Sequence, residues 1–152
     1  MEISRWILVI IGFQCAYFIG KTPVESFHIL VPWITLSLAG LTGIESVFFG
    51  KIASKVTGYA GGGGGYQRQS GINNISVGIT GLLVFILDWG VGADAAVMTV
   101  LLVFMALSGS NHAYSAFKED NRNMRNILRP LMSLLLLVFV LPMMIKALTY
   151  SG

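Results

Sequence analysis

The sequence predicts an all-α, polytopic transmembrane helix bundle with about five spans, formed by a single domain over residues 1–152. Three observations lead to this fold class. Hydrophobic residues make up 55% of the chain and charged residues only 11%, whereas ordinary soluble domains carry about 25% charged residues. The apolar residues gather in stretches long enough to cross a bilayer, and the basic residues gather in the connections on one side. A soluble fold of this size would expose much apolar surface and aggregate, so lipid is the expected solvent.

Five apolar stretches supply the expected helices. A helix needs about 20 mainly apolar residues to cross roughly 30 Å of hydrocarbon. The stretches are residues 3–20, 27–50, 71–89, 94–117 and 128–148. The first is the shortest. No small-residue cleavage site precedes Lys21, so this segment is expected to be a retained helix rather than a signal peptide.

The distribution of lysine and arginine predicts the orientation. With five spans, two basic residues (Lys21 and Lys146) fall on one side and eight on the side of the N-terminus. The eight are Arg5, Lys51, Lys55, Arg68, Lys118, Arg122, Arg125 and Arg129. Because basic residues accumulate in cytoplasmic loops, the N-terminus is expected in the cytoplasm and the C-terminus outside.

Glycine and proline mark the irregular parts of the chain. Residues 51–70 contain five consecutive glycines and are expected to form a flexible cytoplasmic loop between the second and third spans. No Gly-Lys-Ser/Thr follows these glycines, which argues against a phosphate-binding loop. Pro32 and Pro142 lie within spans and predict kinks or irregular helix ends. Pro130 suits the first turn of the last helix.

A charged side chain at the middle of a bilayer costs about 2.5–3.5 kcal/mol. Each ionisable or strongly polar residue within a span therefore needs a partner or a function that explains its presence there. The predicted topology puts several of them at one depth, in the cytoplasmic third of the membrane. Glu45, Asn74 and His112 are expected to face one another, with Asn74 and His112 close enough for direct or single-water contact. The candidate ligand-binding residues are Glu45, Asn73, Asn74, Asn111 and His112. The alternative is that these groups only hydrogen-bond between helices, at about 0.6 kcal/mol each.

Other chemistries have little support in the sequence. His28 and His112 are expected at opposite membrane faces, which argues against haem held by both, and with the single Cys15 they make a poor transition-metal set. We therefore expect no cofactor and no metal. No nucleophile–base arrangement stands out, so an enzyme is not favoured. The charge is a topology signal rather than a nucleic-acid patch. The basic residues expected at the membrane surface are Lys118, Arg122, Arg125 and Arg129.

Two segments resemble a known group. YQRQSGINNISVGITGLL opens one span and GSNHAYSAF closes the next. Together, over residues 66–117, they resemble small uncharacterised prokaryotic membrane proteins distantly similar to the DoxX-like group. The resemblance implies a compact helical bundle in a prokaryotic inner membrane and no established activity. By position it implicates Gln69, Gly71, Asn74, Gly78, Gly81 and His112. Gln69 stands where the group carries an acid.

Two functions remain open at the level of sequence. A non-enzymatic structural or accessory subunit is favoured, because small-residue faces such as Gly40/Gly43 and Ala106/Ser110 suit helix packing. Its partners would be membrane lipids and either further copies of the chain or other subunits of a membrane complex. The alternative is a protein that binds or transports a small molecule such as a lipid or quinone. An aromatic-lined cavity beside Glu45 and His112 would favour the alternative.

Overall fold

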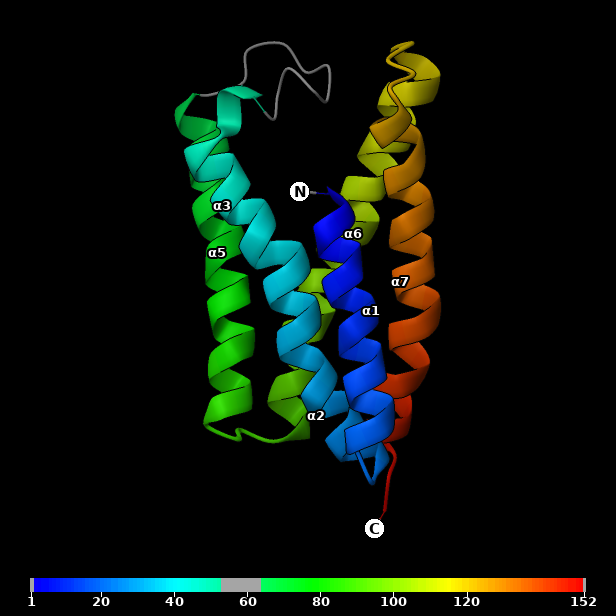
Figure 1. The fold of residues 1–152 in the computed structure, drawn as a ribbon. Helices are drawn as coiled ribbons and strands as arrows, with labels where there is room; N and C mark the ends of the chain where they lie inside the picture. The colour runs from blue at the N-terminus through cyan, green and yellow to red at the C-terminus, as the bar shows by residue number, and fades with distance from the viewer. Residues whose placement is uncertain (1, 53–63, 152) are drawn as a thin grey trace.

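A computed structural model describes residues 2–52 and 64–151, and the regular elements in those ranges are all helices (Figure 1). In chain order they are α1 (Glu2–Ile19), α2 (Pro23–Ile34), the π-helix η1 (Thr35–Gly40), α3 (Leu41–Phe48), α5 (Gly65–Ile86), α6 (Val91–Lys118) and α7 (Met124–Leu148). The segments α2, η1 and α3 follow one another without a break and form one central rod. The predicted all-α bundle is confirmed.

The lengths of the helices agree with a multi-pass membrane protein. Four of the described helices are long and apolar enough to cross a membrane: Pro23–Phe48, Gly65–Ile86, Val91–Lys118 and Asn126–Leu148. The fifth apolar helix, α1, has 18 residues. At 1.5 Å per residue it reaches about 27 Å, slightly less than the hydrocarbon thickness of roughly 30 Å.

The two ends of the bundle differ in their connections. The N-terminus, the end of α3 and the α6–α7 connection lie toward one end, and the α1–α2 and α5–α6 turns lie at the other together with the C-terminus (Figure 1). We call the first the basic end, since Arg5, Lys51, Arg68 and Lys118 lie toward it. We call the second the turn end. The termini lie at opposite ends of the bundle (Figure 1).

The central rod departs from α-helical geometry at η1, just after Pro32. Pro32 has no N–H to donate to the preceding turn. The hydroxyl of Thr35 donates to the carbonyl of Val31 at 2.9 Å. Both features weaken the regular hydrogen-bond ladder where the π-helix begins. The irregularity that the sequence predicts at Pro32 is found here.

Glycines pack the rod against α5. We call this contact the glycine seam; its members are Gly40 and Gly43 of the rod and Gly71, Gly78 and Gly81 of α5. A Cβ added at Gly43 would lie 2.5 Å from the carbonyl oxygen of Gly71, and one at Gly78 would lie 3.0 Å from the Cα of Gly40. The two backbones are therefore in direct contact. The glycines of α5 therefore allow this helix to pack closely against the rod.

The helices begin earlier than the sequence predicts, and at α5 and α7 the shift changes how other residues are assigned. Helix α5 starts at Gly65 instead of residue 71, so the last six residues of the expected 51–70 loop are helical. Residues 53–63 of that loop lie outside the described residues. Helix α7 starts at Met124, which makes Pro130 an interior residue and corrects its assignment to a first turn. Pro130 cannot donate to the carbonyl of Asn126, four residues earlier.

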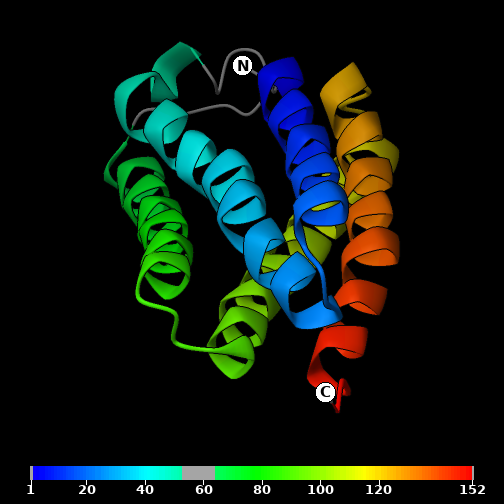
Figure 2. The ribbon, with the colours of Figure 1, turned by 60° about the horizontal axis from the view of Figure 1, so that its bottom comes forward.

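The two sides of α1 are packed differently. Helix α1 lies between the central rod and α7 (Figure 2), but its backbone packs chiefly against α2. Helix α1 contacts α7 through side chains, such as the edge-to-face pair of Phe13 and Phe139, whose ring centroids are 6.1 Å apart. The main core lies around the rod, in Phe27, Leu30, Ile34, Met98, Leu101 and Val140.

Candidate functional site

An ion pair joins α1 to α3 toward the basic end. The guanidinium of Arg5 donates to the carboxylate of Glu45, and the two side chains are only 4% and 19% exposed. Either charge alone would carry a large desolvation penalty at this depth, which the pairing offsets. The sequence predicts His112 as the neighbour of Glu45. That is corrected, because α1 lies against the rod and brings Arg5 to Glu45 instead.

His112 belongs to a second cluster, between α6 and α7. Arg129 Nη1 lies 2.8 Å from His112 Nε2, and His112 Nδ1 lies 2.8 Å from Asn126 Oδ1. Arginine can only donate hydrogen bonds, so Nε2 must accept and the ring proton must be on Nδ1. Asn126 accepts that proton and donates from Nδ2 to the Asn121 carbonyl at 3.0 Å. The chain of donors thus fixes His112 as a neutral ring in one tautomer.

A cavity of about 430 Å³ lies beside both clusters. Arg5 and Arg129 line it, so the partner of Glu45 and the partner of His112 face the same space. Its walls come from α1, η1, α3, α6 and α7. The remaining polar lining residues are Thr42, Ser108 and Ser133, and the aromatic ones are Trp6 and Phe104.

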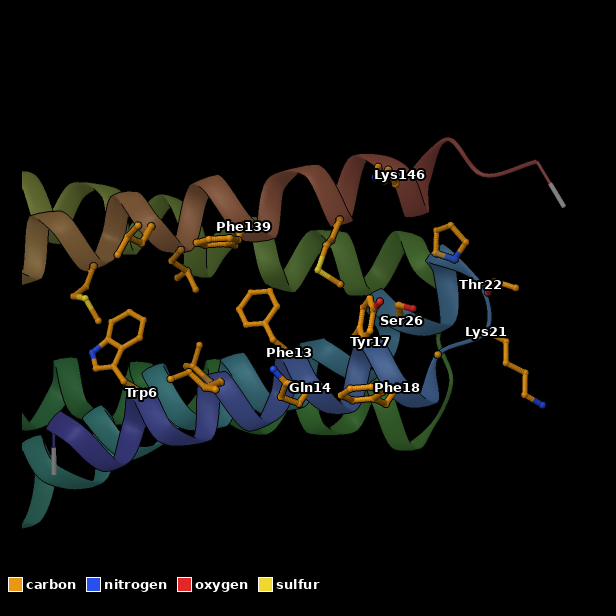
Figure 3. A pocket seen from close by; sticks show the side chains of 18 residues that line it. Trp6, Phe13, Gln14, Tyr17, Phe18, Lys21, Thr22, Ser26, Phe139 and Lys146 are labelled. Carbon is orange, nitrogen blue, oxygen red and sulfur yellow. The ribbon is translucent and has the colours of Figure 1, made fainter.

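A larger cavity of about 920 Å³ continues between α1 and α7 toward the turn end (Figure 3). Trp6, Ile10 and Met132 line both cavities, so the two adjoin each other. We call the combined space the α1–α7 groove. In Figure 3, Trp6 and Phe13 extend from α1 toward α7, whose Phe139 lies opposite Phe13. Lys21 and Lys146 stand at the far end.

The α1–α7 groove opens at the side of the bundle, where a surrounding bilayer would lie. Ile10, Tyr17 and Phe18 are exposed side chains on α1 and also line the larger cavity. Apolar side chains make up most of the lining along its length. The space is therefore lined mostly by apolar groups and open at the side of the bundle.

The asparagines of the predicted site do not join it. Asn74 is buried on the α5 face that carries Gly71 and Gly78, toward the rod. Helices α5 and α6 are close at their short turn and diverge toward the basic end (Figures 1 and 2). Asn74 makes no hydrogen bond to His112 or Glu45 within the described part of the chain. Asn73 and Asn111 are exposed on the outer surface. Among the described residues, the three asparagines are therefore not hydrogen-bonded to Glu45 or His112.

The predicted membrane-surface residues divide into two groups. Lys118 is exposed, and Arg122 is exposed with its Nε 3.0 Å from an oxygen of Asp120. Arg129 instead points into the bundle and bonds His112. The side chain of Arg125 lies outside the described residues. Helix α7 begins at Met124, four residues before the predicted start, so Asn126 is helical and shares one face with Arg129 at i, i+3 spacing. The predicted helix did not include Asn126.

A further acid–imidazole pair lies at the turn end. His28 Nδ1 of α2 is 2.8 Å from Asp94 Oδ2 of α6, and the imidazole stacks on Phe85 at 4.9 Å between ring centroids. Asp94 is fully buried, while the exposed Asp88 lies 4.0 Å from His28 Nε2. The predicted topology already puts all of these residues at one end, so depth alone was a signal for this pair. Neither cavity of the α1–α7 groove is lined by it.

These features define a class: a multi-pass helical membrane protein with a laterally open groove whose basic end carries two arginines. The chain belongs to a family of unknown function, DUF6790, whose model matches residues 2–150. No curated protein and no solved structure matches it. Among the described residues, no group of three or more His, Cys, Asp or Glu could hold a metal ion.

Proposed function

We propose that this protein binds an amphipathic small molecule of lipid or quinone type in the α1–α7 groove. One observation carries the proposal: two adjoining cavities have mostly apolar walls, and Arg5 and Arg129 line the smaller one. Their volumes of about 920 and 430 Å³ fall within the range of roughly 300–1,000 Å³ typical of ligand pockets. The aromatic lining beside the partners of Glu45 and His112 is the feature that favours binding over a purely structural role.

The alternative function, a structural or accessory subunit, has less support than binding. It rested on small-residue faces that could receive another chain. Gly40 and Gly43 are already covered by α5 of the same chain. Of the other face, Ser110 is exposed, but its hydroxyl donates to the Ala106 carbonyl on its own helix at 2.9 Å.

We place the basic end in the cytoplasm of a prokaryote and the protein in the inner membrane. The eight-to-two asymmetry of lysine and arginine supports this orientation, and the resemblance of residues 66–117 to the DoxX-like group supports the location. Reporter fusions at the two termini test the orientation. A C-terminal reporter that is active only in the cytoplasm would contradict it.

The binding function is tested by blocking the groove. In Met132→Trp the larger side chain fills the junction of the two cavities, whereas in Leu131→Trp the same side chain faces outward from the neighbouring position. Each protein is purified in mild detergent, and bound molecules are detected by native mass spectrometry and identified after extraction. We expect the natural protein and Leu131→Trp to retain a lipid-like molecule that Met132→Trp loses. Equal retention by both variants would contradict the proposal.

A further inference from the structure

We propose that the protein forms a homodimer in the membrane through the exposed face of α5, with the two copies of Asn73 hydrogen-bonded to each other. The inference goes beyond the proposed function and does not depend on it, because the α1–α7 groove lies on the other flank of the central rod (Figures 1 and 2). We call the contact surface the α5 outer face; its members are Gln69, Asn73, Ser76, Thr80, Leu83 and Leu87.

The α5 outer face has the spacing of a contact between two parallel helices. All of its members are exposed, and they recur at alternating intervals of four and three residues. This is the a and d pattern of helices that wind around each other. The opposite face of α5 carries Gly71, Gly78 and Gly81 and is packed against the rod. Helix α5 therefore has one face covered within the chain and a second, regularly spaced face that is exposed.

Asn73 is the residue on this face that most needs a partner. Its amide makes no hydrogen bond to another of the described residues. Twenty residues separate the charged Arg68 from the charged Asp88, which is roughly 30 Å of helix and equals the hydrocarbon thickness. Asn73 lies five residues inside this interval. An amide that faces lipid there carries a free-energy cost, which a hydrogen bond to another helix removes.

The two positions that follow Asn73 on this face leave room for a second helix. The hydroxyls of Ser76 and Thr80 donate to the carbonyls of Ile72 and Ser76 on α5 itself, at 3.0 and 2.9 Å. Both hydroxyl protons are therefore satisfied, and both side chains are small. Small residues let two backbones approach closely in a membrane. Asn73 thus supplies the hydrogen bond, and the next two positions supply the close fit.

A second copy of the chain is the partner that matches the α5 outer face. Copies of one chain insert with the same orientation, so a two-fold axis between them runs along the membrane normal and brings each residue to its own counterpart at the same depth. An asparagine amide carries both a donor and an acceptor, so each copy of Asn73 can donate to the other. A single asparagine at an a position sets the register and the oligomeric state of parallel helix pairs.

Helix α6 also exposes an asparagine, but its outer surface does not fit this arrangement. Asn111 lies seven residues from Lys118, at a depth from the basic end similar to that of Asn73. Toward the middle of the span the exposed side chains of α6 are Val103, Phe104 and Leu107. These side chains are bulkier than serine and keep a second backbone at a distance. Asn111 therefore serves as the matched control for Asn73.

The dimer is tested by energy transfer between two populations of the full-length chain, which carry a donor or an acceptor fluorescent protein at the C-terminus. The two are mixed in phosphatidylcholine vesicles and diluted with lipid. We expect transfer in the natural protein to fall along a monomer–dimer curve. Asn73→Leu should weaken association roughly tenfold, because the paired amides are lost. Asn111→Leu should leave the association constant unchanged.

A second measurement locates the contact while Asn73 is kept. It uses a Cys15→Ser background, which removes the single native cysteine. Ser76→Cys then places a thiol on the α5 outer face, and Leu107→Cys places one at an exposed position of α6. We expect mild oxidation in membranes to link chains that carry Ser76→Cys, because counterpart Cα atoms at a two-fold helix contact fall within the roughly 4.4–6.8 Å that a disulfide spans. Chains that carry Leu107→Cys should stay unlinked.

Each alternative occupant of this face gives a different result. Absence of transfer at the highest protein fraction would mean that lipid alone covers the face, and would overturn the dimer. Equal weakening by Asn73→Leu and Asn111→Leu, or linkage of Leu107→Cys as efficient as that of Ser76→Cys, would overturn the assignment to α5. Transfer that follows a curve for three or more chains would overturn the closed two-fold pair.

Discussion

The two flanks of the central rod are built on opposite packing rules. On one flank, the glycine seam brings the backbone of α5 into contact with η1 and α3. On the other, α1 and α7 are held apart by large side chains such as Trp6, Phe13 and Phe139, and the α1–α7 groove lies between them. Lipid is as apolar as a side chain, so helices in a membrane associate through close shape fit rather than hydrophobic exclusion. The seam supplies that fit, and the groove leaves space for a molecule from outside the chain.

The comparison predicts that the seam is sensitive to the smallest added group. Gly43→Ala should lower the free energy of unfolding by about 3 kcal/mol, because the new Cβ meets backbone atoms of Gly71 and Ile75 that cannot move aside. Unfolding in mixed micelles measures this loss. The matched control is Gly92→Ala, where a Cβ meets nothing within 4 Å and the expected change is within about 0.5 kcal/mol. Equal effects of the two variants would mean that the seam is not close-packed.

A smaller effect is expected at the turn end, where the rod is joined to α6. His28→Leu leaves the buried carboxylate of Asp94 without its imidazole partner and should cost about 2 kcal/mol. Asp88→Asn, at the exposed acid on the other side of His28, should change little. Adding Asp94→Leu to His28→Leu should recover part of the loss, since both polar partners are then absent. If the double variant is less stable by the sum of two separate losses, the pair is not coupled.

The smallest effect on stability is expected in the groove. Met132→Trp fills existing space, so its free energy of unfolding should stay within about 0.5 kcal/mol of the natural protein, although ligand retention falls. Chemical unfolding of protein freed of bound lipid gives this value. A loss similar to that of Gly43→Ala would show that the groove is as tightly packed as the seam, and would remove the contrast between the two flanks.

The sequence by itself determined the class of the protein and its long elements. The apolar stretches had to become helices, because a bilayer leaves no other partner for backbone N–H and C=O groups within one span. The spacing of Gly78 and Gly81 puts both on one side of a helix, which suits close helix packing. The predicted depth of Glu45 and His112 within the bilayer also indicated that both residues need polar partners.

Only the tertiary structure decided which partners they have. Depth and helical spacing limit a residue to a level and a face, but they do not state which helix lies opposite. Glu45 meets Arg5 because α1 packs against the rod, and His112 meets Arg129 because α7 begins early enough to put that arginine on a helix beside α6. Asn74 shares their level in the predicted topology but faces the glycine seam. The order in which helices surround the rod depends on the fit of whole surfaces, which no local pattern in the chain records.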